Sequence, residues 1–170
     1  MLTRRFVILA SLLATMLFLG GCESVKSPPG TITTVILLRH ADRYQWEKNL
    51  NEKGVERAKT LPAALADIKV DVIYSPDKVR NLDTVKPFIA ENGTELRVID
   101  TSGAAEKMVA ENPGKTVLWV GNTDNLQSIY GTLGGKDEHP KIYGDIFILT
   151  LTDKGLQKVE KRNFGGPGGN

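Results

Sequence analysis

The chain has 170 residues, a formal net charge of +2 at pH 7 and a single cysteine. One cysteine excludes an intrachain disulfide bond. The near balance of 22 basic and 20 acidic residues excludes the strongly basic surface that nucleic-acid binding requires, so no nucleic-acid partner is expected. The segment between the two unusual ends holds about 130 residues, which suffices for one domain with its own core but not for two.

The first 21 residues predict a targeting segment. Arg4 and Arg5 precede an uncharged run from Phe6 to Gly21, which is too short to span a membrane comfortably. The run ends in Leu19-Gly20-Gly21-Cys22, which resembles the bacterial lipoprotein signal. The resemblance implies cleavage before Cys22 and lipid attachment to that residue. A buried free cysteine in an ordinary helix is the alternative.

Lipid on Cys22 implies a chain that is anchored to a membrane surface without spanning it. Removal of residues 1–21 also removes two arginines, which brings the net charge to about zero. Residues 22–33 contain Ser27-Pro28-Pro29-Gly30 and predict a semi-extended, lipidated tether. Glu23 is not the aspartate of the enterobacterial inner-membrane retention pattern. The expected location is therefore the bacterial cell envelope, at the outer membrane and facing the periplasm.

The next segment, residues 34–162, predicts a single α/β domain. Candidate strands are Thr34–Arg39, Val70–Tyr74, Glu95–Ile99, Thr116–Val120 and Ile146–Leu151. Candidate helices are Glu52–Leu65, Asp77–Glu91, Ala104–Glu111 and Asn125–Leu133. The alternation predicts a three-layer α/β/α sandwich with a mostly parallel sheet, of which Ile146–Leu151 is the final parallel strand.

The end of the chain predicts two further features. Asp153-Lys154-Gly155 is a hairpin signal, so the sheet is expected to finish with an antiparallel edge pair. Residues 163–170 are too rich in glycine to hold a regular element and are expected to be disordered.

The first candidate strand ends on the pair Arg39-His40. The carboxyl ends of parallel strands face the ligand site in open α/β sheets, so both side chains are expected there. Arginine offers a rigid fork of donors to an anion, and histidine can act as a nucleophile or proton carrier near neutral pH. The pair therefore indicates a phosphate site.

Three segments together resemble the histidine phosphatase superfamily, which has the phosphoglycerate-mutase-like fold. Leu38-Arg39-His40-Ala41 resembles its Arg-His-Gly or Arg-His-Ala motif. The segment from Leu50 to Ala58 resembles its Leu-Thr-x-x-Gly-x-x-Gln/Arg-Ala helix start, and the segment from Tyr74 to Thr84 resembles its Tyr-Ser-Ser-x-x-x-Arg-x-x-x-Thr motif. The resemblance extends from about Thr34 to Leu151.

This resemblance implies that His40 is the catalytic nucleophile, which forms a covalent phosphohistidine. Arg39 and Arg80 would then bind the phosphate oxygens. The chemistry of the residues agrees, because two guanidinium groups suit a phosphoryl group whose charge spreads over three oxygens in the transition state. No metal and no cofactor is required. Taken alone, Arg80 would be interpreted as a solvated arginine on a helix.

One position departs from the family pattern. Asn122 stands where the family has a second catalytic histidine, at the end of the strand Thr116–Val120. Its amide can donate a hydrogen bond to phosphate but cannot carry a positive charge or transfer a proton. Loss of one such donor costs about 2.7–4 kcal/mol, or roughly 100- to 1,000-fold in rate, by analogy with oxyanion-hole deletions.

Other candidates are less specific. Asp100 and Glu106 are the nearest carboxyl groups for a general acid, with an ordinary surface carboxylate as the alternative for both. His139 lies in a polar loop and is expected to be exposed to solvent. Tyr44 and Trp46 follow the His40 loop, where they could stack on a substrate or cover the edge of the domain.

Three functions remain open at this point. The first is a histidine-type phosphatase that hydrolyses a phosphate monoester or another phosphorylated small molecule or protein through His40, with weak turnover. The second is a pseudophosphatase, which binds a phosphate-bearing ligand or partner without turnover because of Asn122. The third, a purely structural lipoprotein, requires the set Arg39, His40 and Arg80 to be accidental.

Overall fold

The computed structural model describes residues 24–166. The predicted signal segment, Cys22 and residues 167–170 lie outside the described residues. The elements follow in the order β1 (Thr33–Arg39), α1 (Glu52–Lys59), α2 (Leu61–Ala64), β2 (Val72–Ser75), α3 (Val79–Asn92), β3 (Glu95–Val98), α4 (Ala104–Glu111), β4 (Thr116–Gly121), α5 (Thr123–Thr132), β5 (Asp145–Thr152) and β6 (Gly155–Asn163). None of the described helices is long and apolar enough to cross a membrane.

The six strands form one sheet in the order β3-β2-β4-β1-β5-β6. Strands β3, β2, β4 and β1 are parallel, and β5 and β6 form an antiparallel edge pair. The prediction that Ile146–Leu151 is parallel was wrong, because β5 pairs antiparallel with β1. After α5 the chain returns through residues 133–144 to the carboxyl end of β1, so β5 starts where β1 ends.

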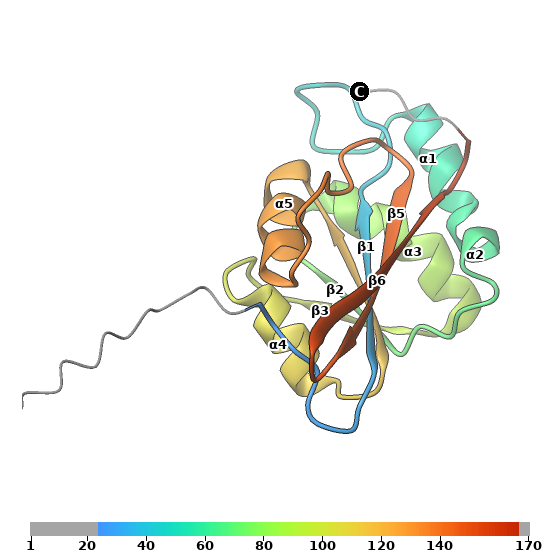
Figure 1. Ribbon diagram of the computed structural model, residues 1–170. Helices are drawn as coiled ribbons and strands as arrows, with labels where there is room; N and C mark the ends of the chain where they lie inside the picture. Colours follow the sequence, from blue (N-terminus) through green and yellow to red (C-terminus); the bar gives the residue numbers. More distant parts are fainter. Residues whose placement is uncertain (1–23, 167–170) are drawn as a thin grey trace, which may run out of the picture.

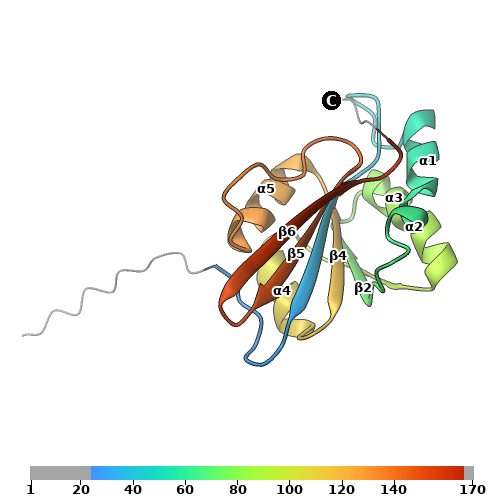
Figure 2. The ribbon, with the colours of Figure 1, turned by 45° about the vertical axis from the view of Figure 1, so that its right-hand side comes forward.

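Alternate residues of the strands bury two separate cores. Val35 and Leu37 of β1 pack into the cluster that contains Met108 of α4 and Leu126 of α5. Ile36 and Leu38 pack into the cluster on the opposite face, which contains Leu61 of α2 and Phe88 of α3. Helices α4 and α5 thus cover one face of the sheet, and α1, α2 and α3 cover the other (Figures 1 and 2). This confirms the predicted three-layer α/β/α sandwich.

The single helix predicted over Glu52–Leu65 is divided in two. Helix α1 ends at Lys59, and Thr60 caps it through its backbone N–H and its hydroxyl, which both donate to the carbonyl of Arg57. Pro62 has no N–H to continue the hydrogen bonds of α1, and it lies instead in the first turn of the short helix α2, which begins at Leu61.

Both ends of the domain are more ordered than the composition predicts. In the predicted tether, Val25 N donates to Thr132 O at 2.9 Å, and Ser27 N donates to Thr152 O at 3.0 Å. In the predicted disordered tail, Asn163 ends β6, and Phe164 is 1% exposed, with its N–H donating to Gly144 O. Burial of one phenyl ring offsets the entropy of ordering its glycine-rich neighbours.

Candidate active site

His40 lies immediately beyond the end of β1. Arg39 is in register with Gly121, the last residue of β4, and His40 N donates to Gly121 O at 3.0 Å. The carboxyl ends of these two neighbouring strands therefore place the residues that follow them side by side. In Figure 1 the loop after β1 lies at the upper end of the sheet, away from the first described residues.

The imidazole of His40 is held in one tautomer. Its side chain is 2% exposed, and Nδ1 lies 2.7 Å from the carbonyl oxygen of Ala41. A carbonyl only accepts, so Nδ1 carries the proton and a neutral ring leaves the lone pair on Nε2. Burial, reinforced by the positive charges of Arg80, Arg39 and Arg43, lowers the pKa of His40 to about 3. The ring is thus neutral and nucleophilic at pH 7.

A cavity of about 420 Å³ opens over His40. It is referred to below as the phosphate cavity, and it is lined by Arg39, His40, Arg43, Lys78, Arg80, Asn122, Thr123 and Asp124. The structure therefore brings together Arg39, His40, Arg80 and Asn122, which the sequence placed at the ends of different elements. The cationic lining suits an anion.

Arg80 does not present its whole guanidinium to this cavity. Its Nε and Nη2 donate to Oδ1 of Asn122 at 3.0 and 2.7 Å. The amide at position 122 is thus an acceptor for the phosphate-binding arginine, whereas the sequence predicted it only as a donor to phosphate. An anion that bound Arg80 with the same two N–H groups would have to displace Asn122 Oδ1.

Arg39 turns toward the loop before β5. Its Nη1 donates to the carbonyl of Lys141, and its guanidinium carbon lies 3.9 Å from the ring centroid of Tyr143. The Tyr143 ring is also 5.5 Å from the ring of His40. Tyr143 thus packs against both members of the Arg39-His40 pair, a role that nothing in the sequence predicts beyond the presence of an aromatic residue just before a strand.

Thr84 connects the nucleophile loop to the arginine helix. Its Oγ1 accepts a hydrogen bond from Ala41 N at 2.9 Å and donates one to Arg80 O at 2.7 Å. The side chain is completely buried. The threonine that closes the Tyr-to-Thr motif therefore holds the segment after His40 at a fixed distance from the helix that carries Arg80.

The Leu50-to-Ala58 motif supports Asp42, the second residue after His40. Asn51 N donates to Asp42 O at 3.0 Å, and Arg57 Nε donates to Asp42 Oδ2 at 2.5 Å between two buried side chains. A Cβ on Gly54 would lie 2.0 Å from Asp42 O, so only glycine allows α1 to approach this closely. The motif positions the nucleophile loop and does not itself line the phosphate cavity.

A matching set of contacts holds the end of β4. Asn125 Oδ1 accepts from Asn122 N at 3.1 Å and from Trp119 Nε1 at 3.2 Å. A Cβ on Gly121 would lie 2.2 Å from that same oxygen. Trp119 is completely buried, which confirms its predicted packing in the core.

The two general-acid candidates are not in the phosphate cavity. Asp100 lines a separate depression with Asp77 and Lys107, and Glu106 is an exposed residue in the first turn of α4. The carboxylate that does line the phosphate cavity is Asp124, which is exposed in the first turn of α5. The prediction for Asp100 and Glu106 relied on chain order, but two strands, β2 and β4, separate β3 from β1 in the sheet.

The side chains of His139, Trp46 and Tyr44 lie outside the phosphate cavity. His139 was expected to be exposed, but it is half-buried and its Nε2 is completely covered. Trp46 is 84% exposed, and Tyr44 is exposed with its hydroxyl donating to Glu52.

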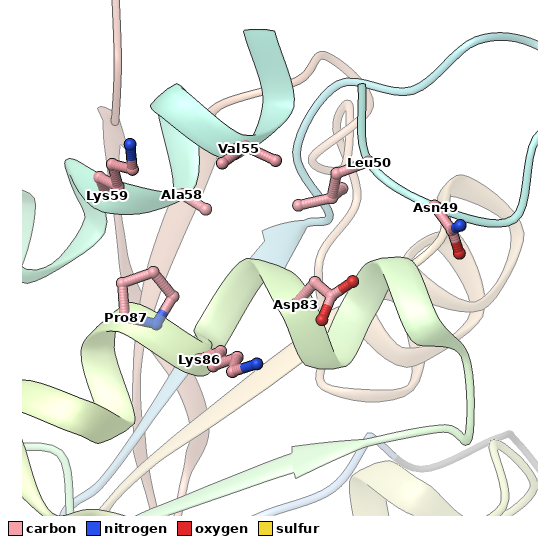
Figure 3. Close-up of a pocket in the computed structure, with 8 residues that line it drawn as sticks. All are labelled: Asn49, Leu50, Val55, Ala58, Lys59, Asp83, Lys86 and Pro87. Atoms are coloured by element: carbon pink, nitrogen blue, oxygen red, sulfur yellow. The ribbon is translucent and has the colours of Figure 1, made fainter. Parts of the chain in front are cut away.

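A separate hollow, of about 330 Å³, lies between α1 and α3 (Figure 3). Figure 3 shows its lining: Asn49 and Leu50 from the loop before α1, Val55, Ala58 and Lys59 from α1, and Asp83, Lys86 and Pro87 from α3. It contains none of the predicted site residues. Within residues 24–166 there is also no group of three or more His, Cys, Asp or Glu side chains arranged to hold a metal ion.

The family comparison agrees with this site. Residues 35–102, from β1 to the loop after β3, match the family model of the histidine phosphatase superfamily (branch 1). No curated protein matches the sequence. The matched segment contains the Arg39-His40 pair and Arg80.

Solved structures show the same fold. The YhfR protein of Bacillus stearothermophilus is 16% identical, with a TM-score of 0.63, and the match covers 74% of this chain and 94% of that one. The protein histidine phosphatase SixA bound to tungstate is 13% identical, with a TM-score of 0.65 over 76% of this chain and 96% of that one. A mycobacterial glucosyl-3-phosphoglycerate phosphatase bound to inorganic phosphate is 15% identical, with a TM-score of 0.59 over 79% and 97%. These similarities show that the chain has a phosphoglycerate-mutase-like fold.

Proposed function

We propose that this protein is a histidine-type phosphatase with weak turnover, in which His40 accepts the phosphoryl group. The observation that carries the proposal is the buried, neutral imidazole of His40, whose Nδ1 is held by Ala41 O and whose Nε2 is free to attack. Arg39 and Arg80 line the same cavity and can bind phosphate oxygens with charge-assisted hydrogen bonds.

The weakness of the turnover follows from Asn122. It supplies no positive charge to the transition state, and its Oδ1 competes with phosphate for two N–H groups of Arg80. The missing cation alone accounts for roughly 100- to 1,000-fold in rate, by analogy with other lost transition-state donors.

The substrate is a phosphate monoester or another phosphorylated small molecule or protein. Similar folds occur in a protein histidine phosphatase and in a glucosyl-3-phosphoglycerate phosphatase. The substrates that these names state, a protein and a small sugar phosphate, differ greatly in size. The shared fold supports phosphoryl chemistry at His40 and leaves both substrate sizes possible.

A second candidate is a pseudophosphatase that binds a phosphate-bearing ligand or partner without hydrolysing it. The observation that favours it is the bidentate contact of Arg80 with Asn122, which occupies part of the phosphate-binding surface. This candidate and the first differ in a single step, the formation of a covalent bond between phosphorus and Nε2 of His40.

Phosphohistidine trapping separates the two candidates. The purified chain is incubated with a labelled phosphate monoester and quenched in alkali, which preserves phosphohistidine. We expect label on His40 in the wild type and none in His40→Ala, with His139→Ala as the matched control because these are the two histidines of the sequence. Binding of inorganic phosphate without any label on the wild type would select the pseudophosphatase.

We also propose that the chain is lipidated at Cys22 and anchored at the outer membrane. Ser27, five residues after Cys22, is bonded to Thr152 at the end of β5, which lies beside the start of β1. An anchor at that end of the sheet would leave the phosphate cavity facing away from the membrane, toward soluble substrates. Mass spectrometry of the protein from native membranes tests this, and an unmodified Cys22 in the soluble fraction would contradict it.

A further inference from the structure

A second cavity adjoins the phosphate cavity. It has a volume of about 380 Å³ and is lined by Arg39, Arg43, Gln45 and Tyr143. It is called the side cavity below. Arg39 and Arg43 line both cavities, so they form the wall between them. The proposed phosphatase activity gives a role to the first cavity but none to the second.

We propose that the side cavity is a second anion subsite and that the substrate class is a phosphoanhydride. The terminal phosphoryl group lies at His40, and the adjacent phosphate group of the leaving portion lies in the side cavity, where Arg43 binds it. The inference rests on the proposed function, since it assigns the substrate class of the same site.

The charge of the lining is the first argument. Four cationic side chains line the two cavities, namely Arg39, Arg43, Lys78 and Arg80, against the single carboxylate of Asp124 among the described residues. Burial lowers the pKa of Arg39 and of Arg80, and the charge of Arg43 lowers both further, which places the three guanidinium groups within electrostatic reach of one another. A monoester dianion balances at most two of these positive charges, whereas a diphosphate carries one or two additional negative charges.

Unsatisfied donors at the shared wall are the second argument. The Nε atoms of Arg39 and Arg43 are completely buried and hydrogen-bond to no atom of residues 24–166. Buried N–H groups normally have an acceptor, and an anion between the cavities would supply one. The Nη1 of Arg43 is fixed by the carbonyls of Tyr44, Gln45 and Glu47. The guanidinium is thus held in place before any ligand binds, which lowers the entropic cost of binding.

The chemistry of the leaving group is the third argument. Nε2 of His40 attacks the terminal phosphorus, the bond from that phosphorus to the bridging oxygen breaks, and the leaving phosphate keeps the electron pair. Water then attacks the phosphohistidine, the N–P bond breaks and its electron pair returns to Nε2, and dihydrogen phosphate is released. A phosphate group leaves without a proton from the protein, whereas an alkoxide must be protonated. Among the described residues, the one carboxylate that lines the two cavities is Asp124. It is exposed and interacts electrostatically with Arg80.

Calorimetric binding of inorganic pyrophosphate and inorganic phosphate to the full chain tests the subsite without requiring turnover. The titrations use His40→Asn so that pyrophosphate stays intact. We expect pyrophosphate to bind at least about tenfold more tightly than phosphate, since one additional charge-assisted contact contributes that much. Arg43→Met is expected to remove this preference while changing phosphate affinity less than pyrophosphate affinity.

A second variant tests the side cavity without changing Arg43, because Arg43→Met removes contacts that hold its loop. Gln45 is exposed, so Gln45→Glu places a negative charge at the side cavity without removing a buried contact. We expect it to weaken pyrophosphate binding about tenfold and phosphate binding much less. Gln127→Glu, at an exposed position of α5, is the matched control with the same change of charge.

The outcomes separate the two proposals. If phosphate binds but pyrophosphate has no advantage, or if the advantage survives Gln45→Glu, the subsite is overturned and the proposed function stands. If neither anion binds, both are overturned. A pyrophosphate preference that Gln45→Glu removes and Gln127→Glu keeps establishes the subsite.

Discussion

The two strand ends that meet at the phosphate cavity differ in the side chains that they present to it. The nucleophile half, residues 40–42, keeps its histidine and is held by Thr84, Gly54 and Arg57. The partner half, Gly121 and Asn122 with Arg80, keeps its backbone support but has an amide that binds the arginine. Contacts from neighbouring elements support the backbone of both halves, and the two halves differ in the side chain that each presents to the phosphate cavity.

The support of the nucleophile half gives the largest expected effect on stability. Asp42→Ala leaves the buried charge of Arg57 without its carboxylate, and such losses cost about 3–5 kcal/mol. Urea unfolding measures this change. The matched control is Glu56→Ala, which breaks the exposed Lys59–Glu56 pair on the same helix and is expected to cost less than about 1 kcal/mol. Equal losses in the two variants would show that the buried pair does not support the His40 loop.

The partner half is tested by replacing Asn122 with histidine. Asn122→His supplies a cation and frees the two N–H groups of Arg80, so kcat on a phosphate monoester is expected to rise by as much as about 100- to 1,000-fold. Asn122→Gln keeps the amide without the charge and should stay slow. The gain must disappear in the double variant with His40→Ala. An inert Asn122→His protein would mean that the site has diverged at more than this position.

The nucleophile half also predicts a pH dependence of stability. The pKa of His40 is about 3 in the folded protein and about 6.5 in the unfolded chain, so the unfolded state binds more protons between these values. The free energy of unfolding should therefore fall as the pH decreases from 6.5 toward 3, by up to about 1.4 kcal/mol per pH unit from this group. Urea titrations of the wild type and His40→Asn at pH 7.5 and 5.0 measure the slope, which the variant should reduce. A slope that His139→Asn reduces and His40→Asn does not would assign the effect to the other histidine.

Two buried asparagines give the smallest expected effects. Asn125 supports the partner half through Trp119 and Asn122, so Asn125→Leu leaves two N–H groups unpaired and should cost about 1–3 kcal/mol. Asn81 is completely buried, and its amide makes no hydrogen bond within residues 24–166. Asn81→Leu is therefore expected to change the free energy of unfolding by less than about 1 kcal/mol, or to raise it. A loss as large as that of Asn125→Leu would reveal a contact of Asn81 that matters for folding.

Much of the fold could be predicted because the strands carry strong local patterns. Thr34–Arg39 and Thr116–Val120 were found almost to the residue, and Ala104–Glu111 was found with its exact bounds. The direction of β5 could not be predicted, because strand orientation depends on the path of residues 133–144 and not on the composition of the strand. The order at the two ends also depends on tertiary contacts, with Ser27 hydrogen-bonded to Thr33 and Phe164 buried in the cluster that contains Leu61 of α2 and Ile146 of β5.

For the site, the sequence by itself determined which side chains stand at the ends of β1 and β4 and in the first turn of α3. Strand ends and motif spacing are local properties, so Arg39, His40, Arg80 and Asn122 could be selected from them. Only the tertiary structure decided what these residues bind. The contact of Arg80 with Asn122, the stacking of Tyr143 on Arg39 and the shared wall formed by Arg43 join residues that are distant in the sequence. Such contacts depend on how the elements pack, because a side chain chooses its partner from whatever the fold brings within hydrogen-bonding distance.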